Sequence, residues 1–63
     1  EMHPRTERVI SAIRSGDYEG KIDRWDVMNN VRSIVANLVD LNLWSEEVED
    51  YLYLLHYSAI DSL

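Results

Sequence analysis

The chain contains no cysteine, one proline and two glycines in 63 residues. Without cysteine, neither a disulfide nor a thiolate metal site can stabilise so small a domain, so its stability must come from dense helix packing or from oligomerisation. Hydrophobic residues nevertheless make up 46% of the sequence, which argues against a disordered chain.

Long apolar runs are also missing. No stretch approaches the roughly 20 apolar residues of a membrane span, and the N-terminus does not have the pattern of a signal peptide. We therefore expect one cytoplasmic domain, residues 1–63, without membrane association. Because Glu1 precedes Met2, Met2 is a candidate for the natural start.

Positive charge is absent from the second half of the chain. All six cations lie at or before Arg32, where six acids balance them, whereas residues 33–63 carry six acids and neither lysine nor arginine. The net charge of −6 therefore belongs to the second half. Nucleic acids and anionic membranes attract Lys and Arg, so this charge disfavours both as partners. It favours either simple solubility or a surface that steers a protein partner.

Helix signals punctuate the chain. Pro4 suits the first turn of a helix, Gly16 suits a helix end, and Asp23 and Ser45 are good N-caps. The pattern predicts an all-α fold of three short helices in one compact unit, with apolar residues recurring at helical spacing. The expected helices span about residues 4–15, 24–41 and 45–62.

The middle and last helices carry more apolar surface than three short helices can enclose. The apolar arc of the middle helix covers roughly 160°, and Leu54 lies off the main stripe of the last helix. We expect Leu38 and Leu52 to be buried where these helices meet, and the chain to dimerise. In the alternative, a monomer, Leu54 contacts the first helix. The residues predicted for the core or the dimer are Val31, Val35, Leu38, Leu52, Leu54 and Leu55.

The opposite side of the last helix combines acids with aromatic residues. Glu49, Tyr53, Tyr57 and Asp61 recur every four residues, so they share one side of a helix, and Glu46 and Asp50 project nearby. Apolar anchors ringed by charge are typical of partner surfaces. These six residues are therefore predicted to bind another protein, and the chain is predicted to be a regulator or inhibitor. The alternative is that both tyrosines pack against the chain itself.

Two alternatives involve DNA. The first two helices could form a helix-turn-helix that uses Arg14, Lys21, Arg24 and Arg32. However, the loop at 15–22 is longer than the usual turn, and acids occupy the start of the would-be recognition helix. Conversely, the carboxylates of the last helix could imitate DNA phosphates and occupy a basic groove.

Catalytic and metal patterns are incomplete. His56 and Glu49 could supply the base and orienting group of a triad, but no nucleophile accompanies them. The alternating acids of the loop at 17–23 resemble a calcium loop, yet Lys21 stands where a ligand is needed. We therefore expect no enzyme activity, no catalytic residue, no metal and no cofactor.

Overall fold

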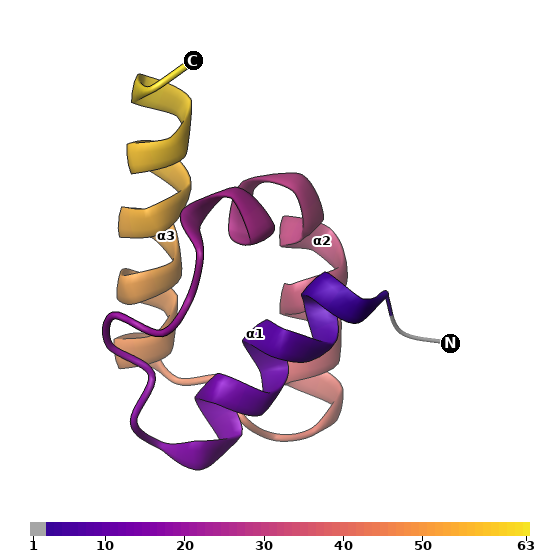
Figure 1. The fold of residues 1–63 in the computed structure, drawn as a ribbon. Helices are drawn as coiled ribbons and strands as arrows, with labels where there is room; N and C mark the ends of the chain where they lie inside the picture. The colour runs from indigo at the N-terminus through magenta and orange to yellow at the C-terminus, as the bar shows by residue number, and fades with distance from the viewer. Residues whose placement is uncertain (1–2) are drawn as a thin grey trace.

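Figure 1 shows three helices, α1 (Pro4–Ser15), α2 (Arg24–Asp40) and α3 (Glu46–Asp61), in the computed structural model, which describes residues 3–63. No strand occurs in that range. The predicted all-α fold is confirmed, and each helix boundary lies within one residue of the expected one. The expected start at Met2 lies outside the described residues.

Local side-chain chemistry explains where the helices begin and end. Asp23 accepts a 2.9 Å hydrogen bond from the Trp25 backbone N–H, and Ser45 accepts one of 3.2 Å from the Val48 N–H. Both bonds satisfy backbone donors that lack a partner in the first turn of a helix. Gly16 ends α1 in the left-handed conformation, with φ 83°, as glycine readily does.

α2 is kinked at Asn30, which the apolar periodicity did not indicate. Asn30 has non-helical backbone angles, φ −132° and ψ 22°. Its side-chain Nδ2 donates a 2.9 Å hydrogen bond to the Asp26 carbonyl, four residues earlier. A side chain that takes this position in the backbone hydrogen-bond pattern bends a helix.

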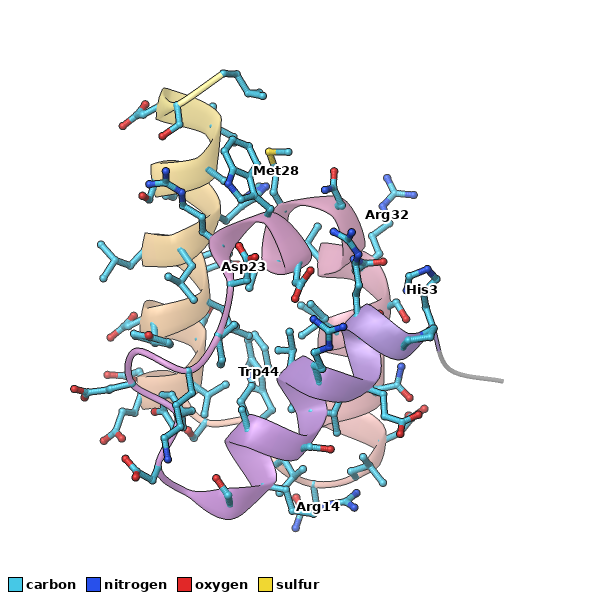
Figure 2. The ribbon with its side chains drawn as sticks, in the orientation of Figure 1. His3, Arg14, Asp23, Met28, Arg32 and Trp44 are labelled. Atoms are coloured by element: carbon cyan, nitrogen blue, oxygen red, sulfur yellow. The ribbon has the colours of Figure 1, made fainter. Side chains whose placement is uncertain are left out.

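α2 is the central element and packs against both α1 and α3, which have little contact with each other (Figure 1). Leu38 and Leu52 are buried at 0% and 3% exposure, as the pattern of the two helices indicated. Trp44, in the short α2–α3 linker, packs against the same core (Figure 2). The buried core cluster comprises Val9, Ile10, Ile13, Tyr18, Ile22, Val27, Ile34, Leu38, Val48 and Leu52.

One acid is buried where α1 meets the start of α2. Asp26 is only 4% exposed, and its Oδ1 lies 3.4 Å from Nη1 of Arg5. Since a buried charge requires a partner, this pair ties the N-terminal ends of the two helices together. Asp26 therefore has a structural task as well as its favourable position in the first turn.

The loop between α1 and α2 supplies part of the core, which the sequence analysis did not anticipate. Tyr18 and Ile22 are both buried. The Tyr18 ring lies 5.2 Å from that of Tyr51 on α3, and the Tyr51 hydroxyl accepts a 3.0 Å hydrogen bond from the Gly20 N–H. This loop, rather than α1, covers that side of α3.

The residues predicted for the core or the dimer fall into distinct classes. Besides Leu38 and Leu52, which are buried, Val31, Val35 and Leu55 are half-buried. Leu54 is 64% exposed, so α1 does not cover it, contrary to the monomer alternative. The dimer itself stays a prediction.

Candidate protein-interaction face

The side of α3 that is turned away from α2 exposes several apolar and aromatic side chains. Tyr53, Leu54, Tyr57 and Ile60 are 46%, 64%, 62% and 42% exposed. At about 100° per residue they lie within one half of the helix circumference, opposite the buried Val48, Leu52 and Ala59. We call this surface the outer face of α3. It comprises Glu46, Asp50, Tyr53, Leu54, Tyr57, Ile60 and Asp61.

The structure brings five of the six predicted partner-binding residues onto this face. Glu46, Asp50, Tyr53, Tyr57 and Asp61 are all exposed. Glu49 is half-buried and lies at the edge of the face, because its position on the helix is close to that of the half-buried His56. The structure also adds Ile60 and Leu54 to the face. The signal for both was present, since neither belongs to the stripe that faces the core.

The two tyrosine rings of the face lie close to each other and to the half-buried His56 at its edge. The ring centroids of Tyr53 and Tyr57 are 6.3 Å apart, and those of His56 and Tyr57 are 5.8 Å apart. Both distances fall in the range of favourable aromatic pairs. Tyr53, Tyr57 and His56 therefore form a cluster of neighbouring rings on α3, and this mutual packing limits the freedom that each tyrosine ring would lose on binding.

The acids of the face form no ion pair in residues 3–63, although Arg24 lies against α3 at Ser58. Within residues 3–63 the ion pairs are Arg5 with Asp26 and Lys21 with Asp17, both away from α3. The electrostatic potential of the outer face of α3 is therefore negative. Burying such charges against an apolar partner would be costly, whereas an opposite charge would attract them over several ångströms.

The acids of α3 also differ in their structural roles. Glu46 stands in the first turn, where the helix dipole favours negative charge. Glu47 accepts a 3.1 Å hydrogen bond from the Tyr18 hydroxyl, and burial together with this acid raises the pKa of Tyr18 above its ordinary value of 10.0. Asp61 stands in the last turn, where no basic residue offsets it and the dipole opposes it.

The four cations of the DNA-binding alternative do not share one face. Figure 2 shows Arg14 at the C-terminal end of α1 and Arg32 beyond the kink of α2, on opposite parts of the molecule. Arg24 donates a 3.0 Å hydrogen bond to Ser58 and lies 5.4 Å from the Trp25 ring centroid, while Lys21 pairs with Asp17. Two of the four are thus engaged within the chain.

His56 and Glu49 are both half-buried on α3, and His56 contacts the Tyr57 ring. The surface depressions lie elsewhere, at the α2 kink and on the exposed side of α1. Among residues 3–63 no group of three or more histidines or acids is placed to hold a metal ion.

Comparisons with protein families, curated proteins and solved structures find no match to this chain. None of the helices described in residues 3–63 is long and apolar enough to cross a membrane.

Proposed function

We propose that this chain is a small, non-enzymatic protein-interaction module that regulates or inhibits another protein by occupying its surface. The observation that carries the proposal is the outer face of α3. Its apolar and aromatic side chains are exposed although the same helix buries a complete stripe on its other side. Contiguous exposed apolar surface rimmed by charge is typical of interaction sites.

The two tyrosines are the proposed anchors. Tyrosine supplies a large, rigid contact area with a hydroxyl for hydrogen bonding, and such residues dominate binding energy at interfaces. Replacing both by alanine should leave the fold intact, because Tyr53 and Tyr57 are exposed and lie outside the core cluster. Partner binding should weaken by at least about 2 kcal/mol, roughly thirtyfold.

The test is quantitative affinity capture with three forms of the immobilised chain. They are the parent, the variant Tyr53→Ala/Tyr57→Ala, and the control Leu41→Ala/Leu63→Ala. The control truncates two exposed apolar residues that lie outside the outer face of α3. A partner retained by the parent and the control but lost by the tyrosine variant supports the proposal. Equal capture by all three forms contradicts it, provided that circular dichroism shows the same helicity.

We also propose that the chain forms a homodimer in the cytoplasm, where a domain without cysteine is not at a disadvantage. The support is apolar surface that the single chain leaves incompletely covered on α2, away from the outer face of α3: Val31 and Val35 are half-buried and Val39 is 57% exposed. Sedimentation equilibrium should show a species of twice the 7.4 kDa chain mass. A 7.4 kDa species at every concentration up to about 1 mM would contradict the dimer.

A further inference from the structure

We infer that the outer face of α3 receives a basic amphipathic helix of the partner protein, one that surrounds apolar side chains with lysine and arginine. This inference rests on the proposed function, because it names the chemistry of the partner at the same face.

The spacing of the exposed apolar residues favours a helical occupant. Tyr53, Tyr57 and Ile60 stand at i, i+4 and i+7, the spacing with which one helix presents anchors to another. The 16 residues of α3 provide a surface about 24 Å long, which suits a partner helix of four turns. Addition of a strand requires a free sheet edge, and residues 3–63 contain no strand.

Charge then decides between the possible occupants. A second copy of the same face would bring acids against acids. In an antiparallel pair Glu46 and Asp50 would approach the other chain's Asp61, and in a parallel pair each acid would approach its own equivalent. Nucleic acids and anionic membranes are repelled for the same reason. A cationic partner protein is the occupant that the face attracts.

Asp61 strengthens the argument because it does nothing favourable for its own helix. Glu46 is explained by the dipole at the start of α3, but Asp61 stands at the unfavourable end without a cation in the last turn. Asp50 lies beyond the first turn and has no ion pair or hydrogen bond in the described structure. Asp50 and Asp61 are therefore the acids whose removal should weaken partner binding without destabilising the fold.

The experiment uses synthetic helical peptides as probes. One peptide of about 18 residues has leucine on one side of the helix and lysine on the other, and two counterparts replace lysine by glutamate or by glutamine. Each is titrated into the isotope-labelled full chain and followed by amide chemical shifts. The Leu/Lys peptide should shift signals of Tyr53, Tyr57 and Ile60, and its affinity should fall as salt rises.

A charge-matched pair of variants separates a specific face from general attraction to an acidic protein. Asp50→Asn/Asp61→Asn should weaken binding of the Leu/Lys peptide several-fold. Glu7→Gln/Glu19→Gln removes the same charge from exposed positions outside α3 and should change the affinity less than twofold. Equal loss in both variants would overturn the inference. So would equal binding of the Leu/Glu or Leu/Gln peptide, or shifts that map away from α3.

Failure of this inference can be told apart from failure of the proposed function. A captured partner that requires Tyr53 and Tyr57, but whose affinity is insensitive to salt and to Asp50→Asn/Asp61→Asn, overturns the basic helix and leaves the interaction face in place. A captured partner that requires neither the tyrosines nor the two acids overturns both.

Discussion

Replacing Leu38 by alanine should destabilise the fold more than the same replacement at Leu54. Leu38 is fully buried in the cluster that also holds Val27, Ile34 and Leu52. Removing its side chain beyond Cβ loses apolar burial and leaves a cavity, at a cost of about 3–5 kcal/mol. A domain of 63 residues has a total stability of roughly 3–9 kcal/mol. Leu38→Ala should therefore remove a third or more of the stability.

Leu54→Ala is the matched control, because it makes the same chemical change on a residue that is 64% exposed. Its effect on the monomer should stay within about 0.5 kcal/mol. The measurement is urea unfolding followed by circular dichroism, at a protein concentration low enough to keep the chain monomeric. Similar midpoint shifts for the two variants would show that the α2–α3 packing described here is wrong.

Three further predictions concern single side chains. The raised pKa of Tyr18 implies a contribution to stability that is complete below pH 10.0 and is lost as pH rises through the higher pKa of the folded state. The unfolding midpoint should therefore fall at alkaline pH, and it should fall less in Tyr18→Phe. Asp61→Asn should raise stability by about 0.3–1 kcal/mol at low salt by removing an unfavourable dipole interaction, and this gain should vanish at high salt; a loss of stability would contradict it. Gly16→Ala should destabilise the fold by about 1 kcal/mol in thermal unfolding, because alanine is strained at the φ of 83°. Nothing lies within 4 Å of the added Cβ, so backbone strain is the only expected cost, and an unchanged midpoint would contradict the prediction.

The helix boundaries could be predicted from the sequence because they depend on contacts between near neighbours. Asp23 and Ser45 bond to N–H groups two and three residues away, and Gly16 needs only its own backbone freedom. The burial of Leu38 and Leu52 follows from helical periodicity in the same way. Local chemistry and periodicity agree at each of these positions.

The remaining features depend on interactions that periodicity does not report. The α2 kink is associated with the hydrogen bond from the Asn30 side chain to the Asp26 carbonyl. Such a side-chain bond competes with the regular backbone bonds of the helix, and hydrophobic periodicity does not reveal it. Tyr18 is buried through contacts with Glu47 and Tyr51, which lie 29 and 33 residues further along the chain. The two glycines near Tyr18 correctly predicted a loop, but they could not show that this loop residue belongs to the core. For the candidate site, helical periodicity correctly predicted that five of the six residues are exposed on one side of α3. Glu49, predicted on the same side, is half-buried at the edge of the face.

The docking of the α1–α2 loop on α3 has a consequence for how the chain folds. The bonds from Tyr18 to Glu47 and from Gly20 to Tyr51 close loops of 29 and 31 residues, about half the chain. Because closing such loops is entropically unfavourable, the contacts of Tyr18 and Gly20 should form only when α3 packs on α2, whereas α1 and α2 also contact each other directly. We expect refolding in a single kinetic phase. We also expect one proteolytic cut between Tyr18 and Gly20 to unfold all three helices together rather than the loop alone.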